Sequence, residues 1–231
     1  MKILDWLTAK KISADQKHTI EELKKLCPIR RDIVGCALYL EVQTDIDLSG
    51  RNILDVKPLE ALTSLEYLAL ENNEISTIAP LSSLIKLKEL DLQNNQVKTL
   101  EPLALISDLK VLNINRNRIN DPGLKWIEKL DGLTNLYAWG NGLSDITPIG
   151  RLHSLEKLYL GDNRIVNVQP LQSLTKLIRL DLSHNKISNI DSLKPLSSNL
   201  KTLVLSGNLL SCIDCDSLRL VLPKTHVVFA G

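Results

Sequence analysis

A leucine pattern recurs along most of this chain at an almost constant interval. In one copy Leu65, Leu68 and Leu70 precede Asn73 and Ile75, and seven further segments have the same arrangement, the first of them degenerate. The copies begin at residues 43, 65, 87, 109, 133, 155, 177 and 200, so most steps are 22 residues, with one of 24 and one of 23. A fixed period of this size predicts a chain of stacked structural units.

The residue types within one copy indicate the structure of each unit. Apolar residues alternate around the central leucines, so a short strand there would bury one face. The amide of the asparagine that follows can pair backbone groups that a tight turn leaves unpaired, in its own copy and in the neighbouring one. A proline in the second half, such as Pro80 or Pro102, favours a short 3₁₀ or extended return over a full α-helix.

The pattern resembles that of the leucine-rich repeat family, L-x-x-L-x-L-x-x-N/C-x-L, and covers about 180 of the 231 residues. The 22-residue form with Pro-Leu in its second half is similar to bacterial internalins and to the phosphatase-regulator class. The resemblance implies a curved right-handed α/β solenoid of about eight repeats, with a parallel concave sheet and a convex side of 3₁₀ and α segments. It also implies a bacterial source in the first case and an intracellular scaffold in the second.

Two copies depart from the consensus in ways that predict local structure. Arg51 replaces asparagine in the first copy, so we expect an asparagine ladder that begins at Asn73. The 24-residue copy contains Asp121-Pro122, and Asp as N-cap with Pro at the first helical position predicts an α-helix on the convex side. The residues expected to face inward from that helix are Leu124, Ile127 and Leu130.

The segments outside the repeats predict caps over the open ends of the solenoid. We expect a helical N-terminal cap over 1–42, repeats over 43–210 and a C-terminal cap over 211–231, all in one structural domain. In the N-terminal cap, Ser13 to Gln16 is a capping box, Cys27-Pro28 ends the helix, and a second helix is expected over roughly 29–36. In the C-terminal cap we expect a short helix from Asp214 to Leu222 and an apolar tail that covers the last coil.

Composition and charge exclude several classes of protein. Lys plus Arg number 28 and Asp plus Glu 27, and a net charge of +1 argues against nucleic-acid binding by counterion release and against a polybasic membrane binder. No segment approaches the roughly 18 apolar residues of a membrane span, and the N-terminus lacks the apolar core of a signal peptide.

The four cysteines lie near the two ends of the chain, as Cys27, Cys36, Cys212 and Cys215. Without a signal peptide or an Asn-x-Ser/Thr sequon, they favour free thiols in a reducing compartment, so we expect a cytoplasmic protein. Export into a host cell by a non-classical route is the alternative. The pair Cys212-x-x-Cys215 is interpreted as ordinary cap cysteines, and a metal or redox role is the alternative.

No catalytic signature is present in the chain. It has no Gly-rich phosphate loop, no His-Glu-x-x-His and no Gly-x-Ser-x-Gly. We therefore expect a non-enzymatic protein without a cofactor or a metal.

The strand residues that alternate with buried leucines predict a binding surface on the concave face. Three of the eight aromatic residues in the chain, Tyr137, Trp139 and Tyr159, fall on adjacent strands there, and Tyr and Trp are enriched at binding hot spots. The candidate partner-binding residues are these three with Arg116, Lys157, Arg179, Asp181, Tyr67, Glu89 and Asp91. The alternatives are that Trp139 packs over the gap left by Ala138, and that the acidic residues only steer association.

The leading function is therefore a protein–protein interaction module, expected to be monomeric, that binds its partner on the concave face. The alternatives are a bacterial effector exported without a classical signal, a repeat segment of a larger enzyme or signalling protein, and a carbohydrate-binding receptor. Fold alone does not separate them, because function depends on the site and not on the scaffold.

Overall fold

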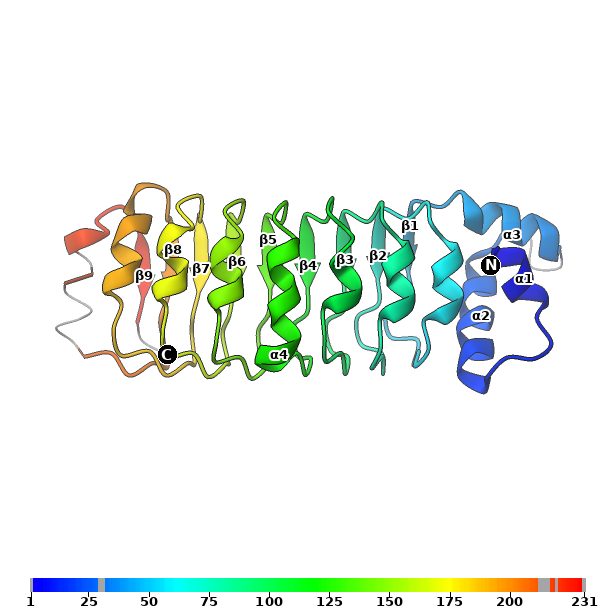
Figure 1. The fold of residues 1–231 in the computed structure, drawn as a ribbon, viewed down its shortest axis with the longest axis horizontal. Coiled ribbons are helices and arrows are strands. Elements are labelled where there is room, and N and C mark those ends of the chain that lie inside the picture. The colour runs from blue at the N-terminus through cyan, green and yellow to red at the C-terminus, as the bar shows by residue number, and fades with distance from the viewer. Residues whose placement is uncertain (1, 29–31, 212–216, 219, 230–231) are drawn as a thin grey trace.

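The structure is a computed structural model that describes residues 2–28, 32–211, 217–218 and 220–229. Within that part of the chain, nine short strands form one open parallel sheet in sequence order (Figure 1). The strands are β1 (Asp45–Asp47), β2 (Tyr67–Ala69), β3 (Glu89–Asp91), β4 (Val111–Asn113), β5 (Asn135–Tyr137), β6 (Lys157–Tyr159), β7 (Arg179–Asp181), β8 (Thr202–Val204) and β9 (His226–Val228). The predicted leucine-rich repeat solenoid is thus confirmed.

The register of the sheet follows the sequence repeat. Leu68 of β2 pairs with Leu90 of β3, and Leu90 pairs with Leu112 of β4, so equivalent residues of successive copies stand side by side. These leucines are at most 1% exposed. Burying one such side chain stabilises the fold by about 1.5–3 kcal/mol. The motif leucines therefore form one continuous core along the solenoid.

Short 3₁₀ segments cover one side of the sheet, as Figure 1 shows. They are η1 (Lys57–Ala61), η2 (Ala79–Ser83), η3 (Glu101–Leu103), η4 (Lys125–Lys129), η5 (Thr147–Arg151), η6 (Gln169–Ser173) and η7 (Asp191–Ser198). Five of them have proline in their first two positions, where the fixed φ of proline fits and its missing N–H leaves no hydrogen bond unmade.

The asparagine ladder begins at Asn73, as expected, and its geometry repeats along the chain. In Asn95 the side-chain nitrogen donates to the carbonyl of Leu70 in the preceding copy at 2.8 Å and to that of Leu92 at 3.1 Å. The side-chain oxygen accepts from the backbone N–H of Ile75 at 2.9 Å. Each ladder asparagine therefore pairs backbone groups of two adjacent copies.

Three helices form the N-terminal cap: α1 (Ile3–Thr8), α2 (Ala14–Leu26) and α3 (Ile33–Glu41). The capping box at the start of α2 is confirmed, because Ser13 Oγ accepts from the Gln16 N–H at 3.0 Å and Gln16 Oε1 from the Ser13 N–H at 3.2 Å. Helix α2 ends before Cys27, as predicted. The sequence did not predict α1, and the second predicted helix lies further along the chain than 29–36, of which residues 29–31 are outside the described part.

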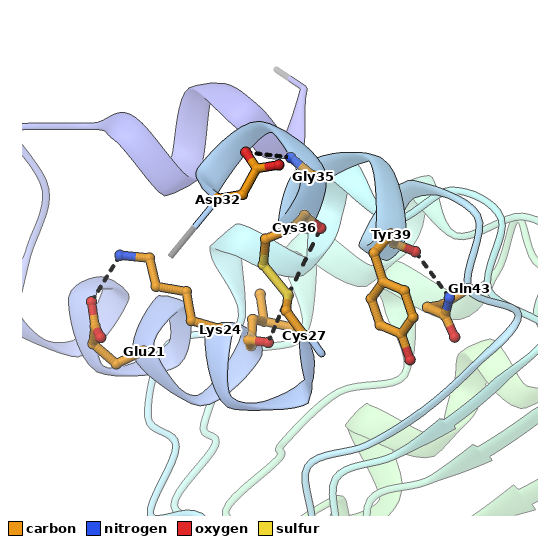
Figure 2. The surroundings of a disulfide bond; sticks show 9 residues. Glu21, Lys24, Cys27, Asp32, Gly35, Cys36, Tyr39 and Gln43 are labelled. Atoms are coloured by element: carbon orange, nitrogen blue, oxygen red, sulfur yellow. Dashed lines mark hydrogen bonds and ion pairs between the residues drawn. A yellow bond between two sulfur atoms is a disulfide. The ribbon is translucent and has the colours of Figure 1, made fainter. Parts of the chain in front are cut away.

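Cys27 and Cys36 form a disulfide bond that joins the end of α2 to α3 (Figure 2). The expectation of free thiols is therefore wrong for these two residues. Nine positions separate them in the sequence, and their Cα atoms lie 5.5 Å apart. Cys212 and Cys215 lie outside the described residues.

The two-residue insertion forms the predicted helix only in part. An α-helical segment, α4 (Asn120–Leu124), passes directly into η4, and Leu124, Ile127 and Leu130 are buried as expected. Asp121 is not the N-cap, because the helix already begins at Asn120. Its carboxylate instead accepts the backbone N–H groups of Ser144 at 2.7 Å and Asp145 at 3.1 Å, which belong to the next copy.

The C-terminal tail joins the sheet as well as ending the solenoid. Strand β9 pairs parallel with β8, with Val227 opposite Leu203, so the described sheet has one strand more than the eight predicted copies. Residues 217–218 and 220–221 are helical, in agreement with the predicted helix, and its other positions up to 216 and at 219 are outside the described residues. No helix in the described part of the chain is long and apolar enough to cross a bilayer.

Candidate aromatic and acidic sheet face

The side chains that alternate with the buried leucines form a single surface, here called the sheet face. The in-step register places Tyr137 beside Tyr159 and Lys157 beside Arg179. The sheet face therefore follows from the repeat spacing, and each strand adds two or three side chains to it.

The three aromatic residues on the sheet face form the aromatic cluster, Tyr137, Trp139 and Tyr159. The rings of Tyr137 and Tyr159 stack with centroids 4.8 Å apart and an angle of 14° between their planes. The Arg179 guanidinium carbon lies 5.5 Å from the centroid of the Tyr159 ring. Such stacked rings and cation–π contacts hold the side chains in place before any partner arrives.

Trp139 lies across the glycine of the following copy. A Cβ atom at Gly161 would come within 2.6 Å of Trp139 Cδ1, so only glycine leaves room for the indole there. On its other flank, the Arg116 guanidinium carbon lies 4.9 Å from the centroid of the Trp139 ring.

Arg116 makes this contact from a left-handed backbone conformation, with φ of 52°. Glycine, asparagine and aspartate occupy the equivalent left-handed position in most other copies, and these residue types adopt it most readily. An arginine there costs conformational energy and gains the contact with Trp139. Backbone strain of this kind is concentrated at functional positions.

The charged candidate residues beside the aromatic cluster differ in their contacts. Lys157 and Arg179 are exposed and adjacent, which makes this edge of the sheet face basic. The Asp181 carboxylate accepts the backbone N–H of Ser183 at 2.9 Å and its hydroxyl at 2.6 Å. Asp181 is thus turned toward the strand end.

The N-terminal half of the sheet face is acidic around Tyr67. Burial raises the pKa of the Tyr67 hydroxyl, and nearby carboxylates raise it further. These carboxylates belong to Asp47, Asp91, Glu89 and Glu71. A tyrosine whose pKa is raised in this way reports a negative potential at its hydroxyl.

A hollow of about 260 Å³ lies between the acidic half and the aromatic cluster. The hollow is lined by Tyr67, Tyr137 and Val111, together with Glu89 and Asp91. The Asp91 carboxylate accepts from Asn113 Nδ2 at 2.9 Å, which orients it on this surface. The sequence pattern placed these residues on one face of adjacent strands but did not predict the hollow.

Gly161 is the other feature of the site that the sequence analysis missed. The signal was available, because glycine stands at an outward strand position directly after the aromatic residues. In the same part of the chain that the structure describes, no three His, Cys, Asp or Glu side chains are grouped as metal ligands would be.

Two protein-family models match segments of the repeats. A family model described as leucine rich repeats (2 copies) matches residues 131–173 and 153–195, and one described as leucine rich repeat matches residues 85–143. A search of curated proteins finds no significant match.

Several solved structures have the same fold. An internalin (inlF) from Listeria monocytogenes aligns with a TM-score of 0.77 and 28% identity over 82% of this chain and 55% of its own. An internalin C2 from the same organism aligns with a TM-score of 0.73 and 28% identity over 81% of this chain and 80% of its own.

A plant protein provides a third comparison. The leucine-rich repeat ectodomain of the receptor kinase GASSHO1/SCHENGEN3 from Arabidopsis thaliana, solved in complex with CASPARIAN STRIP INTEGRITY FACTOR 2, aligns with a TM-score of 0.62 and 28% identity. The alignment covers 71% of this chain and 21% of the receptor chain. The present chain thus spans about half of the first internalin and a fifth of the receptor chain.

Proposed function

We propose, from the premise that this chain is a leucine-rich repeat protein similar to bacterial internalins, that it binds a protein partner on the sheet face through the aromatic cluster. The main support for this proposal is that the aromatic cluster is preorganised. The rings of Tyr137 and Tyr159 stack on each other, and an arginine lies over the Trp139 ring and another over the Tyr159 ring. A bacterial source and a non-enzymatic role are parts of this proposal.

The preorganised rings support binding because they reduce its entropic cost. Association orders side chains at the interface at about 0.5–1.5 kcal/mol for each mobile one. In this protein the rings of Tyr137 and Tyr159 are already in contact, and Arg116 and Gly161 flank the indole of Trp139. Much of that cost is therefore met during folding of the protein itself.

The charge distribution supports a proposal for the chemistry of the partner. Glu89 and Asp91 line the hollow beside Tyr67, so a lysine or arginine side chain of a partner fits there. Lys157 and Arg179 lie at the other end of the aromatic cluster and favour acidic groups. We propose a partner surface that is basic opposite β1–β3 and acidic opposite β6–β7.

The ring contacts also favour a protein partner over a carbohydrate. Sugar-binding platforms present free aromatic faces, whereas here the tyrosine faces stack on each other and both arginines cover ring surface. The remaining ring edges and the guanidinium groups suit the mixed apolar and polar contacts of a protein interface.

An affinity purification with quantitative mass spectrometry tests the proposal. The wild type is compared with a Tyr137→Ala, Trp139→Ala, Tyr159→Ala variant, each shown to be folded by circular dichroism. The matched control replaces three exposed apolar residues away from the strands, Ile85, Leu105 and Val166, by alanine. A partner should be retained by the wild type and the control and lost from the aromatic variant.

Titration of the purified partner then gives the size of the effect. Hot-spot residues contribute about 2 kcal/mol or more each, so Trp139→Ala alone should weaken binding at least about 30-fold. Equal affinity for the wild type and the aromatic variant would place the interface elsewhere on the molecule.

We also propose that the protein works in an oxidising compartment, which differs both from the expected cytoplasmic location and from its alternative, export into a host cell. The support is the Cys27–Cys36 disulfide, because such bonds persist in oxidising compartments and are rare in the cytosol. Alkylation of the natively produced protein under denaturing conditions tests this: both thiols should be protected until a reductant is added. Full alkylation without a reductant would support the cytoplasmic location.

A further inference from the structure

A second cavity lies in the N-terminal cap, away from the sheet face. It has a volume of about 420 Å³ and is lined by residues of α1, the connection after it and α2. Figure 1 shows these helices at the end of the solenoid, beyond β1. The volume falls within the roughly 300–1,000 Å³ of typical small-molecule sites.

Trp6 on the wall of this cavity has a hydrogen-bond donor without an acceptor. The side chain is 4% exposed, and its Nε1 is the one buried side-chain nitrogen or oxygen without a hydrogen bond among the described residues. Buried polar groups are almost always paired, so an exception calls for an explanation. An acceptor atom brought by a ligand would provide it.

The charged residues around the cavity also provide more hydrogen-bond donors than acceptors. Three lysines line the cavity, Lys10, Lys17 and Lys24, whereas Glu21 is the one carboxylate in its lining. That carboxylate already pairs with Lys24 at 3.0 Å, as Figure 2 shows. The ammonium groups of Lys10 and Lys17 make no ion pair or side-chain hydrogen bond within the described part of the chain. A ligand that satisfies this wall therefore carries a negative charge.

The remaining wall is apolar. Leu7 and Ile20 are 5% and 2% exposed, and Ile12 from the connection between α1 and α2 is partly buried against the core. Leu7 and Ile20 are already almost fully covered, so the apolar surface still open to a ligand belongs mainly to the half-buried Ala9 and Ile12, and an inorganic anion would leave it uncovered. The ligand therefore combines an acceptor with an apolar body.

We propose that the N-terminal cap binds a small carboxylate with an aliphatic chain, such as a medium-chain fatty acid. The carboxylate lies against Lys10 and Lys17, and the chain covers Ala9 and Ile12 beside the buried Leu7 and Ile20. Because Trp6 Nε1 exposes less than 1 Å² in the free protein, a carboxylate oxygen reaches it only after the side chains above it shift. The site does not depend on the sheet face, so either proposal can fail without the other.

Nuclear magnetic resonance of the full chain tests this proposal with octanoate as the probe, below its micelle-forming concentration. The protein has three tryptophans, and Trp6→Phe assigns the indole N–H signal of Trp6. Octanoate should shift that signal saturably. Octanol, which has the same chain without the charge, and inorganic phosphate, which has charge without the chain, should leave it in place at the same concentration.

Two lysine variants complete the test. Lys10→Ala with Lys17→Ala should weaken octanoate binding about tenfold or more, because charge-assisted hydrogen bonds to the carboxylate are lost. Lys86→Ala with Lys98→Ala removes two exposed lysines outside the cap and should leave the affinity unchanged. No saturable shift, equal shifts by octanol or phosphate, or equal weakening in both double variants would each overturn the proposal.

Discussion

An interior repeat and the first repeat differ in how they pair the backbone groups at the turn after each strand. In the interior, Asn95 donates to Leu70 and accepts from Ile75, and both belong to the preceding copy. The first copy has no copy before it, so an asparagine at position 51 would lack these partners. This is the physical reason why Arg51 can stand there.

Helix α2 takes the place of the missing copy. The His18 ring nitrogen Nε2 lies 2.7 Å from the Arg51 carbonyl oxygen, and Thr19 Oγ1 donates to the Asp55 carbonyl at 2.7 Å. The Arg51 side chain meets the buried Glu22 at 3.0 Å. One residue type serves every interior copy, whereas the end needs several specific side chains, so the two regions should respond differently to substitution.

The largest effect is expected inside the ladder. Asn117→Ala should lower the free energy of unfolding by about 3 kcal/mol, because the buried N–H of Val97 and the carbonyls of Leu92 and Ile114 lose their partner. Urea denaturation followed by circular dichroism measures it. The matched control Asn135→Ala removes an amide from the sheet face and should change stability by less than about 0.5 kcal/mol. Equal losses of stability in both variants would mean that the ladder hydrogen bonds stabilise the fold no more than an amide on the sheet face does.

The disulfide of the cap ranks next. Replacing Cys27 and Cys36 together by alanine should cost about 2 kcal/mol, near the low end for disulfides because the closed loop is short. A reductant should lower the urea midpoint of the wild type to that of the variant and leave the variant unchanged. If the reductant has no effect on the wild type, the bond does not stabilise the cap.

A smaller effect is expected where α2 meets the first repeat. Thr19→Val keeps the volume of the side chain but removes the hydrogen bond to the partly buried Asp55 carbonyl, which should cost about 1 kcal/mol. Thr63→Val, at an exposed position, is the control in the same denaturation measurement. A Thr19→Val protein as stable as the control would show that the carbonyl finds another donor.

The smallest effect concerns pH. Burial alone would raise the pKa of Glu22, but hydrogen bonds and charges from Lys25 and Arg51 outweigh it and hold the pKa below the ordinary value of 4.5. The unfolded chain therefore takes up this proton more readily, so the stabilisation is present above about pH 4.5 and is lost as the pH falls through the folded pKa. The stability difference between wild type and Glu22→Gln should narrow between about pH 6 and pH 3, and a constant difference would contradict this.

Several features of the cap and of the site could be predicted from the sequence because they depend on residues close together in the chain. The capping box at Ser13 involves positions three apart, and Asn73 was identified as the first ladder residue by its place in the motif. The residues of the aromatic cluster were placed side by side by counting from the start of each copy. Periodicity and local spacing were sufficient in all these cases.

Features that join different copies, or a copy to a cap, were not predictable in this way. Asp121 was assigned to its own helix as an N-cap, but its carboxylate bonds the backbone of the next copy. The tail after 222 was expected only to cover the last coil, and Val227 instead pairs with Leu203 in the sheet. A local pattern does not contain these partners.

The repeat period alone therefore accounts for the solenoid, its strand register, its buried leucines and the position of the asparagine ladder, because a chain with one apolar face per copy can bury it only by stacking in step. The tertiary structure decided which side chains meet across copies. It placed Trp139 over Gly161, formed the Cys27–Cys36 bond and left Trp6 beside a lysine-lined cavity. These contacts depend on how α-helices and loops turn in space, and sequence spacing by itself carries no information on that.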